Sequence, residues 1–177
     1  HPKICPETGE LLAFGYSMTP PYLTYLRVSA SGKLVQTEPI SVKGATMIHD
    51  FNVTRNHVIF MDLPAVWNLE GMAETGLPVL WDESYGARLG VMPRDGGDQD
   101  ITWYEIDPCY VFHPLNSYED GEKIIIDVCR MDDTMKPGSS SPPLLFRWVI
   151  DRSKGTVTET QLDDRMADFP RVCDSKV

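Results

Sequence analysis

Short runs of β-forming residues alternate with polar, glycine-containing turns along most of the chain, and this pattern constrains the fold strongly. Apolar and aromatic residues are concentrated in segments 11–16, 22–28, 34–40, 57–61, 123–129, 144–150 and 156–162. Residues 29–33 and 151–155 have the composition of hairpin connections, and Asp120-Gly121 is a turn signal. Strands joined by short polar turns favour an antiparallel meander over a βαβ unit. The sequence therefore predicts an all-β fold with little helix.

Composition and charge exclude several classes of protein. The chain has 16 basic and 26 acidic residues and a net charge of −10, which argues against a nucleic-acid-binding surface. No apolar run reaches the about 18 residues that a membrane-spanning helix needs. The four cysteines are scattered without a Cys-x-x-Cys pair, which favours separate reduced thiols in a cytoplasmic protein over a disulfide: Cys5, Cys109, Cys129 and Cys173.

Residues 62–85 break the pattern of strands and turns. This segment contains two prolines, two glycines and many large apolar side chains, so it is predicted to be a long connection. Long loops of this kind are often functional. Trp67 and Trp81 are candidates to line an apolar substrate entrance, and the alternative is that they cover an edge of the core.

The strongest candidate site is a histidine in an aromatic segment. His113 follows Trp103, Tyr110 and Phe112 and comes shortly before the turn at Asp120 and the apolar strand 123–129. A side chain that can bind a metal, placed ahead of a turn and framed by aromatic rings, is typical of a site at the mouth of a β architecture.

Two segments resemble signatures of the carotenoid cleavage oxygenase family. Residues 112–121 read Phe-His-Pro-Leu-Asn-Ser-Tyr-Glu-Asp-Gly, where the family has Phe-His-x-x-Asn-x-Tyr-Glu-Asp-Gly. Residues 1–10 read His-Pro-Lys-Ile-Cys-Pro-Glu-Thr-Gly-Glu, similar to the family's His-Pro-x-x-Asp-Pro-x-Thr-Gly-Glu, with Cys5 in place of the aspartate. In the family each segment carries one of four histidines that hold a non-haem iron. The resemblance therefore implies His1 and His113 as metal ligands.

Two further segments extend the resemblance. Residues 47–54 are similar to a His-Asp-Phe signature, which implies His49 as a third ligand. If this segment is a strand, alternation places His49, Phe51 and Val53 on one face, with His49 directed inward beside Phe51. Residues 168–171 resemble the family's Glu-Phe-Pro-Arg, in which the glutamate accepts a hydrogen bond from an iron-bound histidine. Asp168 is one methylene shorter, so this bond requires a backbone shift or a bridging water.

The resemblance covers nearly the whole chain and implies a seven-bladed β-propeller with the iron on its axis. Residues 1–177 are then a single partial segment of a longer domain, made of consecutive antiparallel blades. The family's fourth histidine falls outside this chain. His57 matches no family ligand and is interpreted as structural.

The function implied is that of an Fe(II) dioxygenase that uses O2 to cleave a conjugated carbon–carbon double bond into two carbonyl products. The substrate class is carotenoid, apocarotenoid or stilbene-type. Imidazole suits Fe(II), and neighbouring carboxylates orient the rings. Two alternatives remain open. One is an isomerohydrolase of the same family, which keeps the four histidines, and the other is a non-catalytic β module that binds a hydrophobic ligand.

The expected partners are a hydrophobic, conjugated small molecule and O2. An apolar mouth at residues 62–85 predicts a cytoplasmic protein that contacts membranes peripherally to collect a lipid-soluble substrate. Residues 1–177 in isolation are predicted to bind iron weakly or not at all and to lack oxygenase activity. If they fold stably, they are expected to do so by self-association or by pairing exposed edges, because excised blades expose strand edges and apolar faces.

Overall fold

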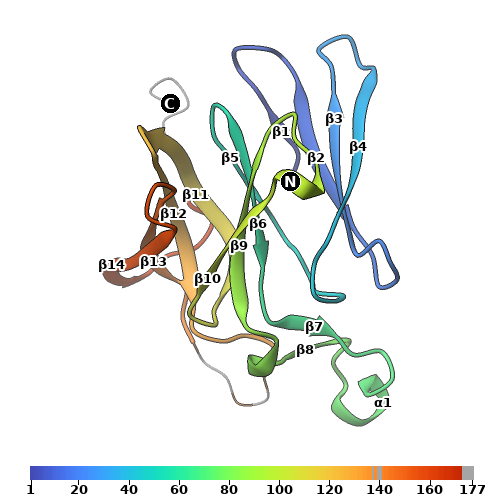
Figure 1. Cartoon of the computed structure of the whole chain (residues 1–177). Coiled ribbons are helices and arrows are strands. Elements are labelled where there is room, and N and C mark those ends of the chain that lie inside the picture. The colour runs from blue at the N-terminus through green and yellow to red at the C-terminus, as the bar shows by residue number, and fades with distance from the viewer. Residues whose placement is uncertain (137, 139–140, 173–177) are drawn as a thin grey trace.

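The computed structural model describes residues 1–136, 138 and 141–172, and its strands form three four-stranded antiparallel sheets and one small two-stranded sheet (Figure 1). The first sheet contains β1 (Lys3–Ile4), β2 (Leu11–Tyr16), β3 (Leu23–Val28) and β4 (Leu34–Ile40). The second contains β5 (Asn52–Val53), β6 (His57–Asp62), β9 (Ala87–Pro93) and β10 (Thr102–Ile106). The third contains β11 (Tyr110–Asp120), β12 (Lys123–Met131), β13 (Leu144–Asp151) and β14 (Thr156–Met166). The all-β prediction is confirmed.

Within each of these sheets the strands follow one another in chain order, so each sheet is a meander. The predicted turn at Asp120-Gly121 joins β11 to β12, and Gly121 has a φ of 57°, a conformation that glycine adopts without steric cost. β14 has 11 residues and is longer than the predicted segment 156–162. Within the described residues, the helices are too short to span a bilayer.

The second sheet is buried on both faces because it packs between the other two. Val58 and Phe60 of β6 pack with residues of the first sheet, whereas Ile59 and Met61 pack with residues of the third. All four side chains are at most 3% exposed. Successive side chains of a strand point to opposite faces, so a strand covered on both sides requires a continuous apolar run. This explains why the run starting at His57 shows no polar alternation.

The connection over residues 62–85 has more structure than the sequence predicts. It contains β7 (Ala65–Trp67) paired with β8 (Val79–Trp81), the one-turn helix α1 (Met72–Thr75) and a 3-10 turn at Glu83–Tyr85. The prediction of an irregular loop is therefore wrong for this segment. The prolines and glycines lie in the connections around the two short strands and not within them. Because they dominate the composition of the whole segment, they concealed the hairpin that the two strands form. In Figure 1 this hairpin and α1 project away from the three sheets.

The cysteines in the described residues are free thiols, as predicted. Cys109 and Cys129 are buried, and burial raises the pKa of Cys109 to about 12. Cys5 is partly exposed. Cys173 lies outside the described residues.

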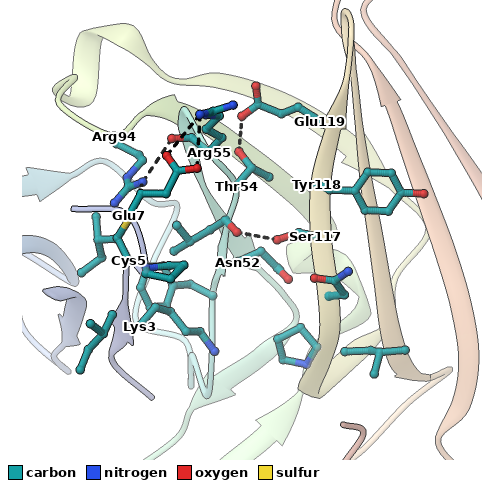
Figure 2. A pocket seen from close by; sticks show the side chains of 18 residues that line it. Lys3, Cys5, Glu7, Asn52, Thr54, Arg55, Arg94, Ser117, Tyr118 and Glu119 are labelled. Atoms are coloured by element: carbon teal, nitrogen blue, oxygen red, sulfur yellow. Dashed lines mark hydrogen bonds and ion pairs between the residues drawn. The ribbon is translucent and has the colours of Figure 1, made fainter. Parts of the chain in front are cut away.

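The first strands of the three sheets share an inner edge. Residues of β1, β5 and β11 line a common cavity of about 710 Å³ (Figure 2). Its lining includes Lys3, Phe51 and Pro114, which follow the three candidate histidines by two, two and one residues. The histidines therefore lie at one end of this inner edge.

A polar network joins the second and third sheets at the opposite end of the cavity. The carboxylate of Glu119 accepts a hydrogen bond from the Thr54 hydroxyl (Figure 2). It also accepts hydrogen bonds from the backbone and side-chain nitrogens of Asn56 and from Nδ1 of His57. Nε2 of His57 lies 3.3 Å from Nη1 of Arg152. Because arginine only donates, this nitrogen of His57 is the acceptor and the proton is on Nδ1. The interpretation of His57 as a structural residue agrees with these contacts.

This network predicts a pH-dependent contribution to stability. Burial opposes ionisation of Glu119, but hydrogen bonds from Thr54, Asn56 and His57 outweigh it and lower its pKa to about 2 from 4.5. A carboxyl whose pKa is lower in the folded state stabilises the fold at any pH above its unfolded-state pKa. This contribution is lost as the pH falls from about 4.5 toward 2. Replacing Glu119 with glutamine should therefore cost about 1–3 kcal/mol at pH 7 and progressively less below pH 4.5.

Thermal or chemical unfolding of the intact protein at pH 7, 4 and 3 would measure this difference. The matched control is Glu122→Gln. The Glu122 side chain is 68% exposed and pairs with Arg152, the arginine that contacts His57 in this network. An exposed pair of this kind contributes at most about 1 kcal/mol. A Glu119→Gln deficit that stays constant from pH 7 to pH 3 would contradict the assignment.

Candidate metal centre

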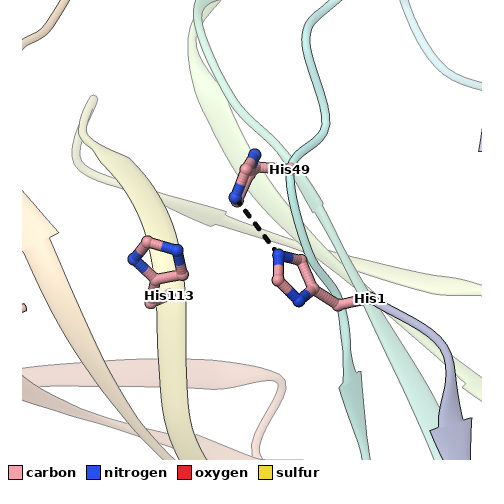
Figure 3. Close-up of side chains that lie close together, drawn as sticks. All are labelled: His1, His49 and His113. Atoms are coloured by element: carbon pink, nitrogen blue, oxygen red, sulfur yellow. Dashed lines mark hydrogen bonds between the residues drawn. The ribbon is translucent and has the colours of Figure 1, made fainter. Parts of the chain in front are cut away.

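Three histidines from three different sheets converge on one point (Figure 3). His1 precedes β1, His49 precedes β5, and His113 lies in β11. Each offers one ring nitrogen, and these nitrogens all lie within 4.8 Å of one another. The structure thus brings together all three histidines that the sequence singled out as ligands.

The spacing within the cluster fits a bound metal ion. Nε2 of His1 lies 3.3 Å from Nε2 of His49, and the ring centroids of His49 and His113 are 5.2 Å apart. Two imidazole nitrogens bound to one ion at about 2.0–2.1 Å are separated by about 3 Å or slightly more. Imidazole is also a usual ligand for divalent iron. The donor set and its geometry are therefore compatible with Fe(II).

His49 is held in the neutral form that binds metals. Burial and, secondly, the neighbouring His113 lower the pKa of His49. A neutral imidazole keeps a lone pair free for a metal, and binding then requires no loss of a proton. The ring of Phe112 packs edge-on against His49, with the centroids 5.3 Å apart, and this contact restricts the rotation of the imidazole.

Asp168 fixes the orientation of His113. Its Oδ1 lies 2.7 Å from Nδ1 of His113, and since a carboxylate only accepts, Nδ1 carries the proton. Nε2 of His113 is then the free nitrogen, and Figure 3 shows a ring nitrogen of His113 directed toward the other two histidines. The bond is direct, so the shorter aspartate needs no bridging water. Such carboxylate–histidine pairs orient metal ligands in many proteins.

Two further contacts tie the histidine segments together, and sequence reasoning did not find them. Nζ of Lys3 lies 2.8 Å from Oδ1 of Asp50, which joins the residues next to His1 to those next to His49. The hydroxyl of Tyr110 donates to the carbonyl oxygen of Met47, at 2.9 Å, and joins β11 to the same segment. The Asp50 side chain is only 6% exposed, and the contact with Lys3 offsets the cost of burying it. Neither contact can be predicted from a local sequence pattern, because the partners are 47 and 63 residues apart in the chain.

Comparisons with known proteins identify the family of the chain. The whole chain, residues 1–177, matches the RPE65 family, described as retinal pigment epithelial membrane protein. The chain belongs to this family of carotenoid oxygenases. A carotenoid cleavage oxygenase of Mycobacterium tuberculosis is 33% identical over 100% of this chain and 45% of its own length. A carotenoid 9,10(9',10')-cleavage dioxygenase of Crocus sativus is 34% identical over 99% of this chain and 34% of its own length.

Solved structures support the fold as well as the family. The crystal structure of a lignostilbene dioxygenase from Pseudomonas brassicacearum has a TM-score of 0.84 and 30% identity, over 97% of this chain and 39% of that one. The three four-stranded sheets are therefore consecutive blades of the β-propeller of carotenoid oxygenases. The chain spans less than half the length of these relatives.

The structure corrects one detail of the His49 signature. Residues 47–51 are not a strand, and β5 begins only at Asn52. Ile48 and Phe51, three residues apart, both enter the core between the first two sheets, whereas His49 is directed to the cluster. The prediction that His49 and Phe51 share one strand face is therefore wrong. Met47 is fixed instead by backbone and side-chain hydrogen bonds to Ala65 and Tyr110.

The two candidate entrance residues lie in the small two-stranded sheet of residues 62–85, a segment called the insertion from here on. Trp67 is in β7 and Trp81 in β8, and both are partly buried against the core between the second and third sheets. The ring of Tyr16 stacks on Trp67 with the centroids 6.3 Å apart. Leu69 and Met72, close in sequence to Trp67, are 50% and 46% exposed. The tryptophans thus cover the core, and the exposed apolar surface of this insertion comes from other side chains.

Proposed function

We propose that the intact protein is a non-haem Fe(II) dioxygenase that cleaves a conjugated carbon–carbon double bond with O2 to give two carbonyl products. The observation that carries this proposal is the convergence of three imidazoles from three successive blades. The substrate class follows from the relatives, which are named for cleavage of carotenoids and of lignostilbene. A further relative is the isoeugenol monooxygenase of Pseudomonas putida, 32% identical over 96% of this chain, so small phenylpropenoids also belong in a substrate panel.

His1, His49 and His113 would hold the iron, and the fourth ligand would come from outside this chain. Iron held by neutral ligands keeps its full positive charge and supplies the capacity to bind and activate O2. The role of Asp168 is to keep the proton of His113 on Nδ1 and to fix the plane of the ring. Lys3 and Asp50 hold the first two ligand segments together.

Product analysis on the intact, iron-loaded protein tests this proposal. A panel of a carotenoid, an apocarotenoid, a hydroxystilbene and isoeugenol would be incubated with ¹⁸O2, and the products identified by mass spectrometry. Two carbonyl fragments that contain ¹⁸O and are absent without O2 are expected. A single isomerised alcohol would instead assign the isomerohydrolase reaction. Tight binding of a substrate without turnover, unchanged after removal of iron, would assign a non-catalytic module.

We also propose that the protein is cytoplasmic and contacts membranes peripherally through the insertion at residues 62–85. The exposed Leu69 and Met72 support this proposal, and so does the exposed Met18 in the β2–β3 connection. Acidic Glu70 and Glu74 in the same insertion disfavour binding to anionic lipid. Burial of apolar side chains should therefore make the larger contribution to the free energy of membrane binding.

Sedimentation with zwitterionic liposomes would measure this contact. Trp67→Ser with Trp81→Ser is predicted to weaken binding, and so is Leu69→Ser with Met72→Ser. The second pair is the sharper test, because its side chains are about half exposed and their loss should leave the fold intact. Binding that is unchanged in both double variants would leave the insertion with only a role in covering the core.

A further inference from the structure

Phe169 has a backbone conformation that its residue type disfavours. Its φ is 51°, in the left-handed region, where the Cβ of every residue except glycine is crowded. The next residue is Pro170, whose ring disfavours helical conformations in the residue before it. The ring of Phe169 is 75% exposed among the described residues, so core burial does not hold it there. A strained conformation of this kind usually marks a residue whose position matters for function.

The backbone of Phe169 is bonded to the side chain of Asp168. The N–H of Phe169 donates to Oδ1 of Asp168 at 2.8 Å, and the same oxygen accepts the Nδ1 proton of His113 at 2.7 Å. The amide therefore holds the carboxylate in the orientation that His113 requires. The segment is fixed on its other side by the N–H of Ala167, which donates to the carbonyl oxygen of Pro143.

The side chain of Phe169 contacts the histidine itself. The centroids of the Phe169 and His113 rings are 4.4 Å apart and their planes are inclined by 33°, so the phenyl ring covers one face of the imidazole. His113 is therefore restrained twice by two consecutive residues, through a hydrogen bond from its edge and through a ring on its face. The position of the ring depends on φ of Phe169, which sets the direction of its Cβ, and the hydrogen bond is supported by the Phe169 amide.

We propose that Phe169 is a positioning residue for His113, acting through its amide, which bonds to Asp168, and through its ring, which the left-handed backbone places on the imidazole. This inference rests on the proposed function, because it takes His113 to be an iron ligand. The arrangement of Asp168, Phe169 and His113 can nevertheless be tested in the metal-free protein.

Three substitutions separate the two restraints. Phe169→Gly removes the ring but adopts the left-handed conformation freely, so the amide bond to Asp168 should persist. Phe169→Ala removes the ring and keeps the backbone strain without its compensation, so the turn should open. Phe169→Tyr keeps both the ring and the turn and serves as the rescue control.

The first measurement is made on the intact, metal-free protein labelled with ¹⁵N-histidine. The Nδ1 proton of His113, assigned by its absence in His113→Gln, should give a protected resonance in the wild type and in Phe169→Tyr. The exchange of this proton with water should be fastest in Phe169→Ala and intermediate in Phe169→Gly. The midpoints of thermal unfolding of both variants should equal that of Phe169→Tyr. A resonance in Phe169→Ala that is identical to the wild type would overturn the proposal, whether or not the protein binds iron.

The second measurement follows iron release from the loaded protein to a chromogenic Fe(II) chelator. Loss of a residue that supports a metal ligand typically lowers metal affinity about 10–100-fold, so release from Phe169→Ala should be at least about tenfold faster. Phe169→Gly should lie between Phe169→Ala and the wild type. Equal release rates in all variants would overturn the role toward the metal. A wild type that binds no iron at all would refute the proposed function, and the resonance of His113 would still decide the role of Phe169.

Discussion

In the intact protein, replacing His113 or His49 with alanine should remove the bound iron and reduce substrate cleavage below detection. Each histidine supplies one of three nitrogens that lie within 4.8 Å of one another, and no carboxylate joins the described cluster to replace a lost imidazole. His113 is also hydrogen-bonded to Asp168. Its loss therefore removes a ligand and leaves the carboxylate without its partner. Iron content per chain and cleavage rate, measured on the same preparation, test this expectation.

The chain provides a matched control in its fourth histidine. His57 is partly buried and bonded to a carboxylate, as His113 is, but it lies outside the cluster. His57→Ala should lower stability through the Glu119 network and leave iron content and cleavage unchanged. Full iron and activity in His49→Ala or His113→Ala would reject the ligand assignment. Loss of iron in His57→Ala at a temperature where the protein is folded would show that the assay reports stability.

The blade pattern could be predicted because it depends on local signals. Strands bounded by glycine turns, such as the one at Gly121, are specified by residues within a few positions of each other. The apolar run after His57 is also visible in the sequence, although its cause is tertiary, since β6 is buried on both faces between two other sheets. The β7–β8 hairpin was missed because its pairing is between three-residue strands separated by 11 residues that include α1, and such short strands have no periodicity to detect.

The candidate ligands could be predicted from motifs, but their arrangement could not. Each motif names a histidine without stating what holds it in place. The contacts that do so, Lys3 with Asp50 and Tyr110 with Met47, join residues from different blades. The irregular backbone at residues 47–51 follows from these tertiary contacts, which override the tendency of the segment to form a strand. The left-handed turn at Phe169 likewise contradicts local preference.

Replacing Phe51 with alanine should show how the core between the first two blades supports the site. Phe51 is fully buried, and its ring lies 5.2 Å from that of Phe14 in β2 and 6.3 Å from that of Phe60 in β6. Removing a buried phenyl ring typically costs about 3–5 kcal/mol, because the cavity that remains closes only in part. Since Phe51 is two residues after His49, this loss should also loosen the segment that carries the ligand.

Phe60→Ala is the control that separates these two effects. Phe60 belongs to the same cluster and is equally buried, but it lies in the middle of β6, where pairing with β9 holds the backbone. Both variants should therefore lose similar stability in thermal unfolding of the intact protein. Only Phe51→Ala should also release iron faster, at a temperature where both variants remain folded. Equal iron release from the two variants would mean that His49 is positioned by Lys3–Asp50 and Tyr110–Met47 alone, without support from the ring of Phe51.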